Sequence, residues 1–120
     1  MASILVVAPH PDDEIISASG VIADAVGRGE EVTVVYVTNG DISGIAQGLV
    51  RQSEAVDAQV GFLGTTESDL IFLDYPDGGL DLIYRNYPDE TDVYKTASGQ
   101  STTYELILLG LQNVFAADPT

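Results

Sequence analysis

Three residues near the start of the chain, His10, Asp12 and Asp13, are of the types that build zinc sites and acid–base sites. They lie in residues 8–14, which hold the chain's only histidine and three consecutive carboxylates. Pro11 prevents a helix between His10 and Asp13, so a turn can bring an imidazole nitrogen and a carboxylate oxygen to one metal, at the 2.0–2.2 Å or so that zinc requires. Asp12 should point elsewhere in the same pocket, which suits a general base acting on a zinc-bound water.

A purely structural interpretation of these acids competes with the metal site. Acids at a helix start complement the helix dipole and cap free N–H groups, each worth about 0.3–1 kcal/mol. Asp12, Asp13 and Glu14 would then serve the helix alone. This interpretation does not account for a single histidine with a proline on either side. We assign Glu14 to it, as an acid of the first helical turn.

The apolar pattern predicts the elements that position this turn. Continuous apolar runs at residues 3–7 and 32–37 indicate strands buried on both faces, and a third strand is expected at 69–73. Helical spacing marks residues 14–27 and roughly 46–62. The second of these helices is expected to bury an apolar side formed by Val50, Ala55, Val56, Val60 and Leu63. The turn after the first strand then lies at a carboxyl end, where open α/β sheets bind ligands.

The last third of the sequence is less regular. Residues 80–101 are predicted to form a long loop with short helical turns, and residues 102–105 resemble a capping box that starts a helix running to about Phe115. The order β-α-β-α-β-loop-α is the outward half of a doubly wound sheet. We therefore expect the chain to be the N-terminal half of a larger domain, truncated before a fourth strand.

Composition limits the classes of partner. The 120 residues fit one domain, and 45% of them are hydrophobic, enough for a core. With 4 Lys+Arg against 19 Asp+Glu, the net charge of −15 argues against nucleic acid and anionic membrane surfaces. The absence of cysteine excludes thiolate zinc sites and disulfides. The first apolar run is too short for a signal peptide or a membrane span, so a cytoplasmic location is expected.

Four segments, in order, resemble the LmbE-like or PIG-L family of zinc-dependent N-acetylglucosaminyl deacetylases. They are Ala-Pro-His-Pro-Asp-Asp-Glu at 8–14, Thr-Asn-Gly-Asp at 38–41, Arg-Gln-Ser-Glu-Ala at 51–55 leading to Leu-Gly at 63–64, and Phe-Leu-Asp-Tyr-Pro-Asp-Gly-Gly-Leu at 72–80. The resemblance implies a Rossmann-like, three-layer α/β/α fold with a mainly parallel sheet. Residues 1–120 would be the N-terminal part of a single such domain.

The resemblance also implies residue roles. His10 and Asp13 would bind Zn²⁺, Asp12 would be the general base, and Arg51 and Asp77 would bind sugar hydroxyls. The reaction would be hydrolysis of the N-acetyl group of a small molecule or glycoconjugate that carries N-acetylglucosamine. Taken alone, Arg51 is also explained by an ion pair with a glutamate on the same helix, and Asp77 by an ordinary turn.

The chain departs from the family in one respect. The family's third zinc ligand is a later histidine, and this sequence has no second histidine. We therefore expect the 120-residue chain alone to be inactive. Fe²⁺ accepts the same ligands as zinc, and an unpaired sheet edge favours homo-oligomers.

Two other function classes compete with the deacetylase. One is a non-catalytic carbohydrate- or metal-binding domain derived from this fold. The other, a nucleotide-binding Rossmann-like module, is disfavoured because no Gly-x-Gly-x-x-Gly follows the first strand. Whether the full-length gene continues into a strand and a histidine motif would separate the enzyme from the binding domain.

Overall fold

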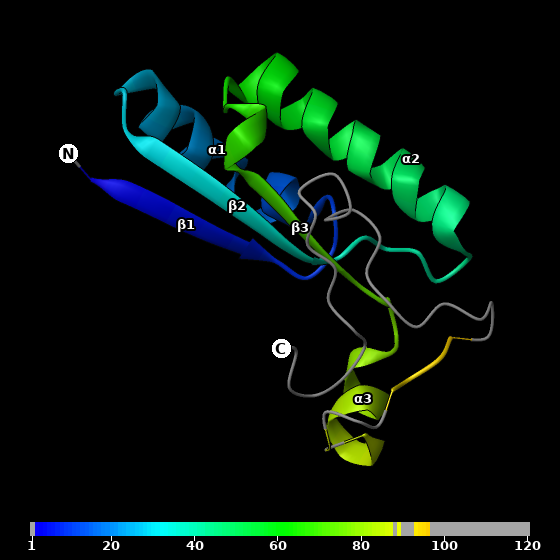
Figure 1. Cartoon of the computed structure of the whole chain (residues 1–120). Coiled ribbons are helices and arrows are strands. Elements are labelled where there is room, and N and C mark those ends of the chain that lie inside the picture. Colours follow the sequence, from blue (N-terminus) through cyan, green and yellow to red (C-terminus); the bar gives the residue numbers. More distant parts are fainter. Residues whose placement is uncertain (1, 88, 90–92, 97–120) are drawn as a thin grey trace.

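A parallel sheet organises the described part of the chain. The computed structural model describes residues 2–87, 89 and 93–96 (Figure 1). Within these residues the strands are β1 (Ser3–Ala8), β2 (Glu31–Thr38) and β3 (Leu70–Tyr75), paired in parallel in the order β1-β2-β3. The α/β class with a parallel sheet is therefore confirmed, and each predicted strand is present.

Helices connect the strands as the periodicity predicts. They are α1 (Asp13–Gly27) and α2 (Ile45–Val56), the latter continued by π-helical turns (Asp57–Leu63). A further helix, α3 (Leu80–Asn86), follows β3. Gly64 ends these π-helical turns in the left-handed conformation, with φ of 80°, and a short 3-10 turn (Glu67–Asp69) leads into β3. The start of α3 falls within the loop for which short helical turns were predicted. The helix expected at residues 102–115 lies outside the described residues, and in the described part no helix has the length and hydropathy needed to cross a membrane.

Both α1 and α2 pack on the same face of the sheet (Figure 1). This follows from the strand order, because two right-handed crossovers that step in one direction put their helices on one side. The core between them includes a stacked pair of rings, Tyr36 of β2 and Phe72 of β3, with centroids 4.6 Å apart. Further core residues come from all these elements: Ala8, Ile22, Ala25, Val32, Val34, Ala55 and Leu70.

The opposite face of the sheet corrects one expectation. Leu5 and Val7 are exposed by 65% and 60%, and Ile71 is also exposed. The prediction that the strands are buried on both faces is therefore wrong for the described residues. Near the carboxyl end of β3, Ile83 of α3 packs in one small cluster with Tyr75. The described part thus forms the sheet and one complete helical layer.

The buried side of α2 also differs from the prediction. Val50 and Val60, expected in the core, are exposed, whereas Gln52 and Gln59 are buried. The reason is electrostatic, because these two glutamines donate hydrogen bonds to buried carboxylates. A buried carboxylate is costly without donors, and this requirement prevails over the apolar stripe.

Candidate active site

The loops that follow the three strands meet at the carboxyl edge of the sheet. The backbone N–H and the hydroxyl of Thr38, at the end of β2, both donate to the carbonyl of Pro9, at 3.0 and 2.8 Å. The carboxylate of Asp41 accepts the backbone N–H of Asp77 at 3.0 Å. The loop after β2 therefore ties together the turns after β1 and β3, as expected for the ligand-binding edge of such a sheet.

His10 lies between two carboxylates. Its Nδ1 is 3.2 Å from Oδ2 of Asp13, and its Nε2 is 2.9 Å from Oδ1 of Asp77. The same oxygen of Asp13 also accepts the backbone N–H of His10 at 2.9 Å. Burial lowers the pKa of His10, but the hydrogen bonds and charges of Asp77 and Asp13 outweigh it, so the pKa lies above its ordinary value. Both nitrogens of the His10 ring are therefore held by carboxylates, one from its own turn and one from the turn after β3.

The predicted metal ligands, His10 and Asp13, are brought together by the structure. Both side chains are about 40% exposed, so a cation can reach them. Two donors on a tetrahedral zinc at about 2.0–2.2 Å are roughly 3.3–3.6 Å apart, close to the observed 3.2 Å between Nδ1 and Oδ2. An imidazole and a carboxylate therefore fit a zinc or iron ion. Among the described residues, no cluster of three or more potential ligands forms.

Asp12 has an unusual backbone conformation. Its φ of 122° is in a region that L-residues rarely adopt, which costs on the order of 1–3 kcal/mol and persists where neighbouring contacts enforce it. Asp12 precedes the first residue of α1, but its side chain makes no capping hydrogen bond. Its side chain is 58% exposed and pairs with Arg51. The structural interpretation of Asp12 as a side-chain cap is therefore not what the structure shows.

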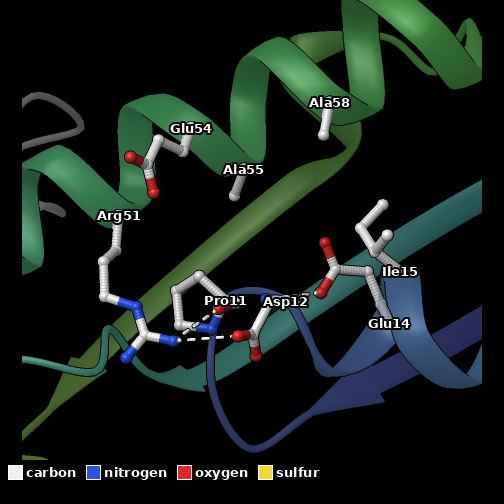
Figure 2. Close-up of a pocket in the computed structure, with 8 residues that line it drawn as sticks. All are labelled: Pro11, Asp12, Glu14, Ile15, Arg51, Glu54, Ala55 and Ala58. Atoms are coloured by element: carbon white, nitrogen blue, oxygen red, sulfur yellow. Dashed lines mark hydrogen bonds and ion pairs between the residues drawn. The ribbon is translucent and has the colours of Figure 1, made fainter.

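Arg51 reaches from α2 to the turn (Figure 2). Its Nη2 donates to the carbonyl of Pro11 at 2.9 Å and to Oδ2 of Asp12 at 3.2 Å, and its Nη1 donates to the carbonyl of Gly40 at 3.4 Å. These partners, rather than Glu54, hold the guanidinium. A pocket of about 210 Å³ lies beside it, lined by Pro11, Asp12, Glu14, Ile15, Arg51, Glu54, Ala55 and Ala58.

Asp77 lies on the other side of the imidazole. Its backbone is held by Asp41, and Gly78 follows it with φ of 77°. A second pocket, of about 270 Å³, is lined by Pro9, His10, Val37, Thr38, Asp77, Gly78, Leu80 and Asp81. Asp77 thus contacts a predicted metal ligand directly, which its turn sequence alone did not indicate.

Besides Asp41, two buried carboxylates belong to this edge, and they were not recognised from the sequence. Glu14, expected as an ordinary first-turn acid, is 1% exposed. Asp74, fully buried with φ of 60°, accepts hydrogen bonds from Asn39 at 2.8 Å and from Gln52. The available signal was the Thr-Asn-Gly-Asp segment at 38–41, whose polar residues directly follow a buried strand.

Two curated relatives match a short part of the chain. A segment of 40 residues is 48% identical to the 1D-myo-inositol 2-acetamido-2-deoxy-alpha-D-glucopyranoside deacetylases of two strains of Corynebacterium glutamicum. The segment is 33% of this chain and 14% of the relative. The match therefore covers a small part of an enzyme much longer than these 120 residues.

Solved structures match a larger part. The conserved protein TT1542 of Thermus thermophilus is 34% identical with a TM-score of 0.55, over 67% of this chain and 35% of that one. GalB, the 4-carboxy-2-hydroxymuconate hydratase of Pseudomonas putida KT2440, is 28% identical with a TM-score of 0.54, over 64% and 35%. The N,N'-diacetylchitobiose deacetylase of Pyrococcus horikoshii, at 23% identity, TM-score 0.54 and coverage of 74% and 41%, shows the shared fold.

The family assignment rests on a match to most of the chain. The family model described as PIG-L, GlcNAc-PI de-N-acetylase, matches residues 5–109. This range contains the strand ends, the His10 turn and the Arg51 helix described above. The chain therefore belongs to the PIG-L family.

Proposed function

We propose that this chain forms part of a metal-dependent hydrolase that removes the N-acetyl group from a glucosamine-containing substrate. The observation that carries the proposal is the turn after β1, where Nδ1 of His10 and Oδ2 of Asp13 lie 3.2 Å apart beside the exposed carboxylate of Asp12. The family and the deacetylase relatives support the same reaction class.

His10 and Asp13 would hold the metal, which we propose to be Zn²⁺ or, with the same ligands, Fe²⁺. When bound, such an ion polarises an amide carbonyl and lowers the pKa of water to about 7. Asp77 would keep the His10 ring oriented, as carboxylates behind metal-binding histidines commonly do. The resemblance calls for a further histidine ligand, and the sequence has no second histidine, so we infer that the 120-residue chain alone is inactive.

Asp12 would act as the general base. Arg51 holds its Oδ2, so Oδ1 would take the proton of the attacking water. The proton would then pass to the nitrogen as the acetamide C–N bond breaks, giving acetate and a free amine. A base in this role contributes about 10²–10⁴-fold to the rate.

Arg51 and Asp77 would bind the sugar hydroxyls. Arginine has five N–H donors, and the three bonds to Pro11, Asp12 and Gly40 leave donors for a ligand. Both residues line pockets next to the turn. We propose that the partner is a small molecule or glycoconjugate that carries N-acetylglucosamine.

The alternative is a carbohydrate- or metal-binding domain without catalysis. Within the described part of the chain no cluster of three or more ligands forms, and this observation favours it. The hydratase among the similar structures also shows that the fold serves a different reaction. Activity must therefore be measured and not taken from the fold.

The deciding experiment measures metal content and acetate release on the complete gene product. We expect about one zinc or iron per chain, a higher melting temperature with added zinc, and acetate release from N-acetylglucosaminyl-inositol or diacetylchitobiose. His10→Ala should abolish the melting shift and the acetate release. A wild-type protein that binds metal but releases no acetate would support the binding domain, and an unchanged melting curve would contradict the metal site.

We also propose a cytoplasmic location and self-association through the sheet. The exposed side chains of Leu5 and Val7 on β1 favour burial against another surface. Light scattering after size exclusion tests self-association, and cell fractionation tests the location. A monomer at micromolar concentration would contradict self-association. Recovery of the protein outside the cytoplasm would contradict the proposed location.

A further inference from the structure

Glu14 is a carboxylate buried at the base of the turn after β1. It stands in the first turn of α1, where an acid is normally solvated, yet it is 1% exposed. Its side chain lies between the turn and the helical segment that carries Ala55 and Ala58 (Figure 2). A carboxylate in such a place must be held by several donors.

One oxygen of Glu14 is fixed from the core. The hydroxyl of Tyr36 on β2 donates to Oε1 at 2.6 Å, and the amide of Gln59 donates to the same atom at 3.2 Å. The hydroxyl of Thr65 donates to the other end of that amide, at 3.4 Å. The carboxylate is therefore anchored by groups from two elements that do not belong to the turn.

The other oxygen of Glu14 holds the backbone of Asp12. Oε2 accepts the N–H of Asp12 at 3.1 Å, the residue whose φ is 122°. Arg51 meanwhile holds the side chain of Asp12 through Oδ2. Asp12 is therefore held at its backbone from the core and at its carboxylate from α2.

We propose that Glu14 is a positioning residue that fixes the backbone of Asp12, and through it the direction of the Asp12 carboxylate, against the buried frame of Tyr36 and Gln59. This inference rests on the proposed role of Asp12 as the base. Glu14 itself does not touch substrate. Its effect should therefore appear in the chemical step and not in binding.

Glu14→Gln and Glu14→Ala separate positioning from stability in the complete gene product. The glutamine keeps an oxygen for the Asp12 N–H, and its NH₂ then faces Tyr36 and Gln59. The Tyr36 hydroxyl can rotate to accept, and the Gln59 amide can turn over to present its oxygen, with the Thr65 hydroxyl accepting from its NH₂. We expect kcat to stay within about threefold for Glu14→Gln and to fall about 10- to 100-fold for Glu14→Ala, with KM within about twofold. Val34→Ala is the stability control: Val34 is buried in the core away from the turn, so its truncation should destabilise the fold but keep kcat near wild type.

Hydrogen exchange of the Asp12 amide tests the same contact without activity. The amide should be protected in wild type and in Glu14→Gln, and should exchange at least about tenfold faster in Glu14→Ala than in Val34→Ala. If Glu14→Ala does not fold, Glu14→Asp takes its place, because the shorter side chain cannot span Tyr36 and Asp12. Equal Asp12 exchange in all variants would overturn the proposal. If the wild type proves inactive, the proposed function fails, and the exchange result still decides whether Glu14 positions Asp12.

Discussion

Nε2 of His10 lies 2.9 Å from Oδ1 of Asp77, although the two residues are 67 positions apart. Asp77 is 16% exposed and its backbone is held by Asp41. The contact leaves Nδ1 facing Asp13. Asp77 thus holds the ring so that Nδ1 is the nitrogen beside Asp13, the other predicted metal ligand.

Asp77→Asn should weaken zinc binding. Carboxylate partners of metal-binding histidines commonly contribute about 10- to 100-fold in affinity, and we expect a loss at the lower end because asparagine keeps an oxygen near Nε2. Calorimetric zinc titration of the metal-free protein measures it. Asp81→Asn is the matched control, since Asp81 pairs with Arg85 and its substitution removes the same charge nearby. Equal losses in both variants would mean that the effect is general electrostatics.

Asp12→Asn should separate metal binding from hydrolysis. The amide cannot take a proton from water, so kcat should fall by about 10²–10⁴-fold, while the zinc-induced rise in melting temperature remains. Asp13→Asn should instead lose that rise, because Asp13 faces the imidazole nitrogen. Acetate release and thermal unfolding with and without zinc give both readouts. An active Asp12→Asn enzyme would remove Asp12 from the role of base.

Gly40→Ala should act through Arg51. A Cβ at Gly40 would overlap the Arg51 guanidinium, 2.6 Å from Cζ, so that side chain must shift and its bond to Asp12 is disturbed. The positive φ of 64° adds about 1 kcal/mol of strain. Gly29→Ala is the control, because it has φ of 74° with nothing within 4 Å of the new Cβ.

Kinetics then distinguish the two glycine variants. Both should lose similar stability in urea unfolding, but Gly40→Ala should also shift KM or kcat in the direction of Arg51→Ala. The double variant Gly40→Ala/Arg51→Ala should have a kcat/KM no lower than that of Arg51→Ala, because both substitutions remove the same contact. Fully additive effects would show that Gly40 acts independently of Arg51.

Tyr36 should make stability fall in alkaline solution. Burial, with the hydrogen bond and charge of Glu14, raises the pKa of Tyr36 well above its ordinary value. A raised pKa in the folded state means that its contribution is complete below about pH 10, the unfolded value, and is lost as the pH rises further. Urea unfolding from pH 8 to 11.5 should show a shallower decline for Tyr36→Phe than for wild type.

The matched control for this experiment is Tyr84→Phe. Tyr84 is 78% exposed, so its removal should leave the alkaline decline as steep as in wild type. An identical decline for wild type and Tyr36→Phe would contradict the assignment to Tyr36. Tyr36→Phe should also be less stable than wild type at neutral pH by about 1–3 kcal/mol, because Glu14 loses a buried donor.

The sequence by itself determined the three strands, the two helices that connect them and the turn at 8–14, because apolar periodicity and proline are local signals. It also indicated that His10 and Asp13 can converge, since two residues and a proline separate them, and the structure brings them to 3.2 Å. Whether a metal binds there remains a prediction.

Only the tertiary structure decided which partners hold the site. Asp77 reaches His10, Arg51 reaches Asp12, and Glu14 turns inward to Tyr36, all across contacts between distant segments. The buried side of α2 was decided in the same way. Local periodicity favours its valines, but carboxylates removed from water require donors, and Gln52 and Gln59 supply them. Such a requirement arises only once the strands and helices are packed together.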